Sequence, residues 1–387
     1  MVRDGLNDIT SRISVEAIRH QVEALRYRAS RWSLGEWFGV ALVLLVVILA
    51  IDLVRRLVVG DIGPSTVGTF LWRGSVDGLL IALAAVGLSM TYSILRFANF
   101  SQGDLVTTGA FTGWAAAYVV AGIGVADFGT RFFLNPDRGT SARELDMHIF
   151  GAPLAIFTGL IVAAVMTILV ALAIDKLVYK RMRNAGGIPL LIASVGVALA
   201  LRYIIVFFYG ERTRGVTRSS PVIEHELLFW TDAVDAHQLV VVVIGVLMVF
   251  SLHIVLQYTK LGKAMRAMAD NKDLALVTGI PTERVVLVTW VLGAGLTGMG
   301  GYLIVLEQET LNFNTGWFLL LLIFAAVILG GIGSIYGAIV GALIIGMAIN
   351  ISLVWIPSDL TEVAAFMLMI LILIFRPSGI FGGVETA

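Results

Sequence analysis

The sequence contains no cysteine, and charged residues make up only 14% of its 387 residues. The absence of cysteine excludes disulfides, thiolate metal sites and thiol nucleophiles together. Soluble domains carry about 25% charged residues, whereas 58% of this chain is hydrophobic. A chain so poor in charge and so rich in apolar residues is an integral membrane protein.

The motifs of common enzymes and nucleotide-binding proteins are also missing. The chain has no G-x-x-x-x-G-K-[ST] phosphate loop, no H-E-x-x-H helix and no G-x-S-x-G turn. Its 5 histidines do not lie at metal-ligand spacing. The 27 basic residues are balanced by 27 acidic ones, which leaves no positive excess for nucleic acid. We therefore expect no catalysis, no bound metal or cofactor and no nucleic-acid partner for this chain.

Long apolar runs occupy most of the chain. Crossing about 30 Å of hydrocarbon takes roughly 20 apolar residues in a helix, and the sequence offers ten such runs. They are residues 37–54, 75–95, 104–124, 153–176, 188–209, 238–257, 285–305, 317–336, 338–356 and 361–375. The sequence therefore predicts an all-α polytopic membrane protein with about ten transmembrane helices.

Lysine and arginine are distributed unevenly between the two sets of loops. Most lie in the amino-terminal tail, the 176–183 loop and the 258–286 loop. Because loops rich in basic residues stay in the cytoplasm, we expect both termini and the 258–286 loop to be cytoplasmic. Loops 125–152 and 210–237 would then face outward, where they either receive a soluble binding protein or cap the spans.

The amino-terminal tail, residues 1–36, mixes charges of both signs and lacks the apolar core of a secretory signal peptide. Within it, residues 14–28 have helical spacing of apolar side chains. This pattern predicts either an amphipathic helix lying on the membrane surface or a flexible tail.

One polar segment, YTKLGKAMRAMADNKDLALVTGIPTERVV at residues 258–286, stands between two apolar runs. No glycine or proline occurs between Lys263 and Val277, so a single helix is predicted there, and Gly279 with Pro281 ends it. One side of this helix is apolar, and the other is charged. The apolar residues are Ala264, Met265, Met268, Ala275 and Leu276. The helix is expected to lie across a membrane face, either as a solvated loop helix or as a docking element.

A second polar stretch, RFANFSQGD at residues 96–104, separates two predicted spans. Unsatisfied backbone is unfavourable in lipid, so such a break needs cover from protein or from a watery cavity. Asn99, Ser101 and Gln102 either hydrogen-bond a polar substrate or satisfy the chain reversal, and the pattern favours the second role.

The run LGGIGSIYGAIVGALIIG is rich in glycine, including Gly330, Gly331, Gly333 and Gly337. Small residues three and four positions apart let helix backbones approach closely. The GGIGS part of this run, near 330–334, is the expected divide between two spans. Helix packing is the main interpretation of the glycines, and a flexible gate at this break is the alternative.

Four motifs, in this order, resemble the branched-chain amino acid permease family of ABC importers. They are NFSQGD followed by VTTGAF, G-K-A-x-R-A-x-A with a later G-I, G-G-x-G-S-x-x-G-A-x-x-G, and the closing FRPSGIFGG. The resemblance covers residues 70–382 and leaves outside it the tail and an extra amino-terminal helix at 37–60. Many relatives carry histidine where this chain has Gln102, so a role that needs a titrating imidazole is in doubt here.

The resemblance implies a function for each motif. The short helix of the 258–286 segment would sit in a groove of an ATP-hydrolysing subunit. Its coupling residues would be Gly262, Lys263, Ala264, Arg266, Ala267, Asp270 and Gly279. The substrate pathway would include Asn99, Ser101, Gln102, Thr107 and Thr108.

The resemblance also implies partners and a location. A second related permease, two cytoplasmic ATPases that hold ATP and magnesium, and a periplasmic binding protein would complete the importer in a bacterial inner membrane. The substrates would be branched-chain amino acids, or related solutes such as urea and amides.

The alternative from another class is a secondary transporter driven by an ion gradient, which needs paired ionisable groups near the midplane. Only Arg202 lies clearly within a span, and the sequence shows no obvious partner for it. Asp77 lies four residues after Arg73, so an i,i+4 ion pair at the membrane interface is expected there.

Overall fold

The computed structural model describes residues 34–123, 142, 144–217, 222–227 and 230–382. The tail, the helix expected over 14–28 and most of the 125–152 loop lie outside these residues. The chain divides into two units, residues 1–55 and 56–387. The helix expected at 37–54 is present as α2 (Leu34–Val59), which crosses that boundary.

All ten predicted segments coincide with helices, which confirms the all-α polytopic fold. The helices after α2 are α3 (Pro64–Leu95), α4 (Gln102–Gly122), α5 (Pro153–Ile174), α7 (Gly187–Tyr209), α8 (Ala236–Tyr258), α11 (Thr282–Gln308), α12 (Thr315–Gly330), α13 (Ile335–Ser352) and α14 (Thr361–Phe375). In the described part of the chain, 8 helical segments of 18 or more residues are apolar enough to cross a membrane. The 16-residue α12 is shorter.

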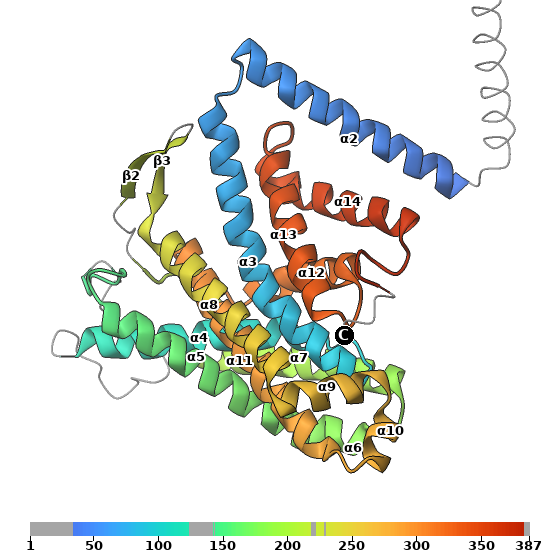
Figure 1. Cartoon of the computed structure of the whole chain (residues 1–387). Helices are drawn as coiled ribbons and strands as arrows, with labels where there is room; N and C mark the ends of the chain where they lie inside the picture. The colour runs from blue at the N-terminus through green and yellow to red at the C-terminus, as the bar shows by residue number, and fades with distance from the viewer. Residues whose placement is uncertain (1–33, 124–141, 143, 218–221, 228–229, 383–387) are drawn as a thin grey trace, which may run out of the picture. The chain divides into compact units, whose positions relative to one another are not determined.

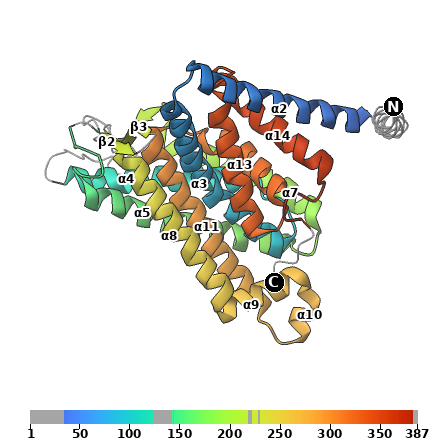
Figure 2. The same ribbon diagram turned by 45° about the horizontal axis from the view of Figure 1, so that its top comes forward.

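Helix α3 forms the centre of the second unit, with α11, α12 and α13 packed along it (Figures 1 and 2). Glycine allows this close approach, because a Cβ on Gly78 would stand 2.7 Å from the Cα of Leu343, and one on Gly74 would stand 2.8 Å from the Cα of Met347. Of the apolar window of α3, 89% is buried, whereas the corresponding share of α14 is 11%. Outer helices such as α14 therefore present apolar faces suited to lipid or to another membrane subunit.

Four short strands occupy the loops at one end of the helices, and the sequence did not predict them. Strands β2 (Val222–Leu227) and β3 (Trp230–Asp235) form an antiparallel hairpin within the 210–237 loop. Strand β1 (Arg214–Gly215) pairs with β4 (Thr310–Leu311), which directly follows α11. The 210–237 loop is therefore tied to the end of a central helix.

The glycine-rich GGIGS run near 330–334 separates two helices, as the sequence predicts, although the predicted span limits of 317–336 and 338–356 lie a few residues later than the break. Helix α12 ends at Gly330 and α13 begins at Ile335. Gly331 and Gly333 have φ values of 110° and 87°, which side chains with a Cβ rarely adopt. The backbone conformation of these two glycines sets the position of the break.

The prediction of a single helix over 263–277 is wrong, because two helices occupy this segment. Helix α9 (Lys260–Asp270) and α10 (Lys272–Val277) meet at Asn271, whose backbone is extended with φ −150°. The Asn271 side chain accepts a hydrogen bond from the backbone N–H of Leu274 at 3.0 Å and so caps α10. Asparagine is among the preferred N-cap residues, and this signal in the sequence was missed.

Candidate functional site

Helix α9 is amphipathic and is held firmly at its start. The Thr259 hydroxyl accepts a hydrogen bond from the N–H of Gly262 at 3.1 Å, which caps the helix. Gly262, Met265 and Met268 are buried against the transmembrane helices. A Cβ on Gly262 would lie 2.0 Å from the carbonyl oxygen of Leu256, so only glycine fits there. The remaining face carries the exposed Lys263 and Asp270.

Helix α10 exposes apolar side chains rather than burying them. Leu274, Leu276 and Val277 are 61%, 60% and 84% exposed, whereas Ala275 is buried. The expectation that Leu276 belongs to the buried face is therefore wrong, because the break at Asn271 changes the direction of the chain. Gly279, at φ 83°, ends this segment as predicted.

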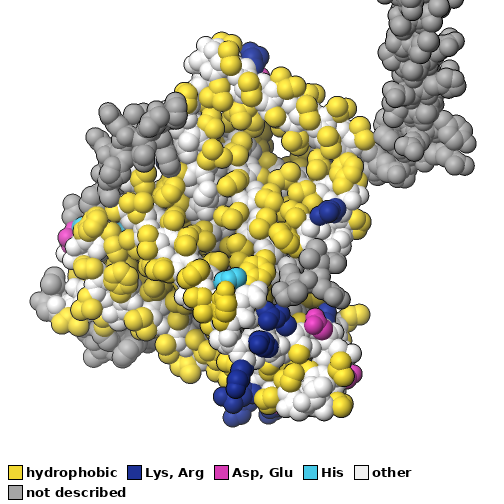
Figure 3. All heavy atoms as spheres, viewed as in Figure 1, with side chains coloured by type: hydrophobic (Ala, Val, Ile, Leu, Met, Phe, Trp, Pro, Cys, Tyr) yellow, Lys and Arg dark blue, Asp and Glu magenta, His cyan; other side chains and the backbone are white. Residues whose placement is uncertain are grey.

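Basic side chains gather at the end of the structure that α9 and α10 form (Figure 3). The exposed Leu274, Leu276 and Val277 belong to α10. The segment is also anchored to α3, since the Arg96 guanidinium donates to the carbonyl oxygen of Ala269. The exposed face of α9 and α10, defined by Lys263, Asp270, Leu274, Leu276 and Val277, is called the loop surface below. A mixed apolar and charged surface on a fixed pair of helices is suited to binding another protein.

A second basic loop lies on the same side as this segment. The π-helical turn η1 (Asp175–Tyr179) and α6 (Lys180–Met182) follow α5. Arg183 forms ion pairs with Asp175 and with Glu283 at the start of α11, both at 2.7 Å. Lys180 also pairs with Glu283 at 2.8 Å. The two loops that were predicted to be cytoplasmic therefore share one end of the molecule.

The structure separates the predicted coupling residues into two groups. Lys263, Asp270 and Gly279 are exposed, whereas Ala264 and Ala267 are half-buried and Gly262 is buried. Arg266 turns inward, and its Nη1 donates to Oε1 of Gln257 at 2.9 Å. Arg266 therefore contacts the membrane body rather than belonging to the loop surface.

The break before α4 is closed by its own polar side chains. The Asn99 Oδ1 accepts hydrogen bonds from the Ser101 N–H at 3.1 Å, the Ser101 hydroxyl at 2.7 Å and the Tyr179 hydroxyl at 3.2 Å. Gln102 donates through Nε2 to the Ala84 carbonyl at 2.9 Å and to the Thr297 hydroxyl at 2.7 Å. These bonds serve the chain reversal and join α3, α4, η1 and α11.

The two threonines of the predicted pathway are likewise bonded inside the helix bundle. The Thr107 hydroxyl accepts from the Gly316 N–H at 3.1 Å and bonds its own helix at Gly103. Thr108 donates to the carbonyl of Asp104 at 2.7 Å. All five predicted pathway residues are at most 6% exposed, so the present conformation holds them against protein.

The charge of Arg202 is paired inside the membrane region. Its Nε and Nη2 each lie 3.2 Å from one carboxylate oxygen of Asp104. The guanidinium carbon also lies 4.4 Å from the centre of the Trp317 ring. The statement that Arg202 has no partner is therefore wrong, because the fold brings together residues 98 positions apart.

The expected ion pair between Arg73 and Asp77 is wrong, because no ion pair joins these two residues in the described part of the chain. Asp77 instead accepts a hydrogen bond through Oδ2 from the Asn350 Nδ2 at 2.7 Å. This bond joins α3 to α13, the helix that packs most closely along it.

Three residues with metal-binding side chains meet near the start of α8. Asp235, His237 and Glu309 each place one ligand atom within 4.8 Å of the others. The His237 Nε2 accepts from the Ile149 N–H at 3.3 Å, and Asp235 Oδ1 accepts from the His237 N–H at 2.7 Å. These bonds hold the local backbone. A metal bound at Nδ1 of His237 would leave the ring proton on Nε2, where it would face the Ile149 N–H, and two donors cannot hydrogen-bond each other. We assign no metal to this cluster.

The glycine-rich motif forms a close backbone contact between α12 and α13. A Cβ on Gly330 would lie 1.9 Å from the carbonyl oxygen of Gly337, and one on Gly337 would lie 2.3 Å from that of Gly330. The backbone N–H groups of Ile380 and Phe381 donate to the carbonyls of Leu329 and Gly330, each at 2.9 Å. The carboxy-terminal segment therefore pins the end of α12.

This arrangement of apolar helices around a buried polar break, with an amphipathic segment at one end, defines a multi-pass membrane permease component. Residues 70–373 match the family described as "Branched-chain amino acid transport system / permease component". The chain belongs to this family.

Curated relatives agree with the family assignment. The chain is 28% identical over 321 residues to the high-affinity branched-chain amino acid transport system permease protein LivH of Escherichia coli K12, covering 82% of this chain and 96% of that protein. The permease protein BraD of the corresponding Pseudomonas aeruginosa system is 25% identical over 318 residues, which are 82% of this chain and 96% of BraD. A probable LivH of Methanocaldococcus jannaschii is 26% identical over 336 residues, 84% of this chain and 95% of its own. No solved structure matches the chain.

Proposed function

We propose that the chain is the transmembrane permease subunit of an ATP-driven importer for branched-chain amino acids or related small polar solutes. The observation that carries this proposal is the loop surface on α9 and α10. Two capped helices are fixed to the transmembrane body and present lysine beside exposed leucine and valine. Leu274, Leu276 and Val277 are exposed together on one short helix, and neighbouring exposed apolar side chains of this kind are typical of a binding surface, which a docking subunit would cover.

The partners follow from this surface and from the family. Two ATPase subunits that bind ATP and magnesium would dock in the cytoplasm, one of them on the loop surface. A second, related permease would cover apolar outer faces such as that of α14. A soluble binding protein would deliver the solute to the opposite end, where the β2–β3 hairpin lies. Both termini would be cytoplasmic, and the helix at 37–60 would be an addition outside the permease body.

The solute path is proposed to pass the break before α4. Asn99, Ser101 and Gln102, with Thr107 and Thr108, supply buried polar atoms among the transmembrane helices. Their bonds to α11 and η1 would have to open before these atoms reach a solute. The proposed pathway therefore requires a conformation in which α4 moves relative to α11.

Uptake into proteoliposomes tests the importer proposal. We expect leucine, presented by the cognate binding protein, to enter vesicles that contain the permease and its ATPase only when ATP is supplied. The Asp104–Arg202 pair provides the paired ionisable groups that a secondary transporter needs. Leucine uptake driven by a proton gradient, without ATP or an ATPase subunit, would therefore reject the importer and favour that alternative.

Docking is tested by charge reversal on the loop surface. Lys263→Glu places a carboxylate at an exposed position of α9, and we expect it to prevent co-purification of the ATPase while the permease stays folded. Arg212→Glu is the matched control, because Arg212 is also exposed but lies in the segment between α7 and β1, beyond the opposite end of the spans. Equal co-purification of the ATPase with both variants would contradict the docking assignment.

A further inference from the structure

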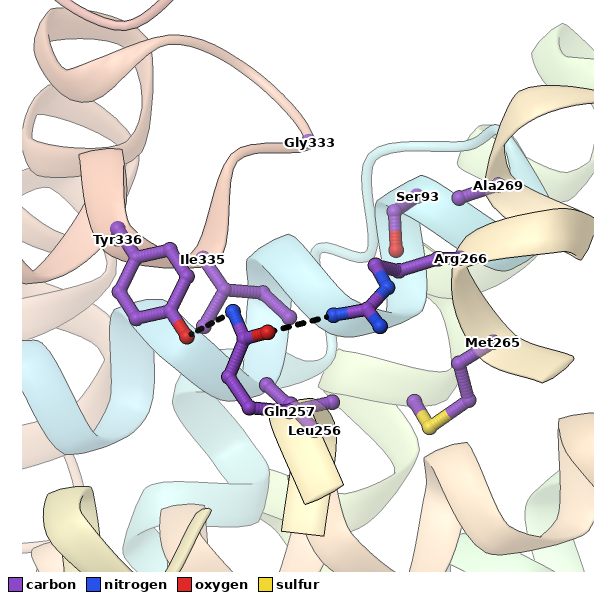
Figure 4. A pocket seen from close by; sticks show the side chains of 9 residues that line it. All are labelled: Ser93, Leu256, Gln257, Met265, Arg266, Ala269, Gly333, Ile335 and Tyr336. Atoms are coloured by element: carbon purple, nitrogen blue, oxygen red, sulfur yellow. Dashed lines mark hydrogen bonds between the residues drawn. The ribbon is translucent and has the colours of Figure 1, made fainter. Parts of the chain in front are cut away.

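A chain of hydrogen bonds leads from α9 into the membrane body (Figure 4). Arg266 donates through Nη1 to Oε1 of Gln257 at 2.9 Å. The other side of the same amide, Nε2, donates to the Tyr336 hydroxyl at 3.0 Å. That hydroxyl also lies 2.9 Å from Nδ1 of His253. One glutamine side chain therefore joins α9, α8 and α13.

Tyr336 occupies a position from which it can transmit displacement. It is the second residue of α13 and follows the break that contains Gly331 and Gly333, both at positive φ. The end of α12, on the other side of this break, is pinned by the backbone bonds of Ile380 and Phe381. The two sides of the break pack on each other through Gly330 and Gly337, but their other attachments differ: α12 is bonded to the carboxy-terminal segment, and the start of α13 is bonded through Tyr336 to α8.

A cavity of about 70 Å³ lies beside these bonds. It is lined by Arg266, Gln257, Tyr336 and Gly333, with Ser93 of α3. A cavity needs about 10–15 Å³ of such space to admit one water molecule, so this one can admit water, and it leaves Arg266 and Gln257 free of close packing on one side. Such side chains can change position without disturbing a packed core.

We propose that Gln257 and Tyr336 are positioning residues that transmit the movement of α9 to the amino-terminal end of α13. This inference rests on the proposed function, since it assigns the step that follows ATPase docking. When the ATPase moves α9, Arg266 pulls on the Gln257 amide, and Gln257 displaces the Tyr336 hydroxyl. Gly331 and Gly333 absorb the rotation, and α13 moves relative to the pinned end of α12. Because α13 packs along α3 through Gly74 and Gly78, its displacement reaches the central helix.

The test compares variants that remove the bonds with one that keeps them. Tyr336→Phe removes only the hydroxyl, and Gln257→Leu removes both amide contacts. Gln257→Glu retains an acceptor for Arg266, and its second carboxylate oxygen can accept from the Tyr336 hydroxyl. That hydroxyl can in turn accept from His253 when the imidazole carries its hydrogen on Nδ1. Tyr203→Phe is the control, because Tyr203 lies on α7 and its side chain is 66% exposed.

Each variant is reconstituted with its ATPase and binding protein, and leucine uptake is measured per ATP hydrolysed. We expect Tyr336→Phe and Gln257→Leu to assemble normally and keep basal ATP hydrolysis. Uptake per ATP should fall by roughly two- to thirty-fold, the range found when residues along a coupling contact are changed. Gln257→Glu should recover most of the loss, and the double variant Gln257→Leu with Tyr336→Phe should lose no more than the worse single variant.

The outcomes separate this inference from the proposal on which it rests. If the native complex shows ATP-dependent uptake and both variants match Tyr203→Phe, the transmission role is refuted and the importer stands. If the variants lose ATPase binding, the residues only support docking, and the transmission role is again refuted. If the native complex shows no ATP-dependent uptake, the proposed function falls, and the transmission role falls with it.

Discussion

Removing one charge of the Asp104–Arg202 pair should strongly destabilise the protein, whereas removing both should not. Asp104 is fully buried and the Arg202 side chain is 11% exposed, so a single replacement leaves a buried charge without its partner. Breaking such a pair from one side destabilises by about 3–5 kcal/mol. We therefore expect losses of that size for Asp104→Leu and for Arg202→Met, measured as the free energy of unfolding in lipid bicelles by denaturant titration.

The double variant Asp104→Leu with Arg202→Met should recover most of this loss. An apolar pair of similar volume is often neutral relative to a buried ion pair, and what remains is the lost contact of Arg202 with Trp317, worth about 1 kcal/mol. Lys180→Met provides the control, because Lys180 and Glu283 are 55% and 61% exposed. Its effect should stay below about 1 kcal/mol. Single losses below about 1 kcal/mol, or a double variant as unstable as the two singles summed, would refute this account of the pair.

Leucine uptake by the same double variant distinguishes a structural pair from an ion site. If the pair only joins α4 to α7, a folded double variant continues to transport with ATP. If uptake is lost while folding and ATPase assembly are intact, the charges take part in transport, as a secondary transporter would require.

Three further replacements test other parts of the structure. Gly330→Ala should destabilise the protein by about 1–3 kcal/mol through overpacking against Gly337, whereas Gly196→Ala, with nothing near its added methyl, should be neutral or stabilising in the same unfolding measurement. Asn271→Ala should remove the cap of α10 and weaken ATPase co-purification, whereas Asn271→Asp, which keeps an acceptor, should not; equal losses would contradict the capping role. Gln102→Leu removes the two hydrogen bonds to the Ala84 carbonyl and the Thr297 hydroxyl and should lower the unfolding free energy by about 1–3 kcal/mol, and an unchanged value would contradict the assigned bonds.

The transmembrane helices could be predicted because their signal is local. A run of about 20 apolar residues predicts a span independently of the rest of the sequence, and each predicted run proved to be a helix. The GGIGS run marks the break, but the exact limits of α12 and α13 were harder to predict, because apolar residues flank it and the backbone conformation of Gly331 and Gly333 decides where each helix ends. Composition locates a span, but the conformation of individual glycines decides where it stops.

The polar contacts could be predicted only in part. The chain reversal at Asn99 and Gln102 follows from the local pattern, and the structure shows the expected bonds. The partner of Arg202 could not be found by spacing, since no periodicity connects α4 with α7. The inward turn of Arg266 was also missed, because a basic residue in a polar loop is expected to face solvent, and only the fold places Gln257 within its reach.

Disulfide cross-linking from a single introduced cysteine tests the central claim most directly. The natural chain has no cysteine, so Lys263→Cys creates one reactive position on α9, and Arg212→Cys creates one beyond the opposite end of the spans. Each variant is assembled with an ATPase subunit that carries cysteines around its surface groove. The account predicts a cross-linked permease–ATPase species from position 263 and none from position 212. An assembled transporter that cross-links from position 212, or that never does so from position 263, would contradict it.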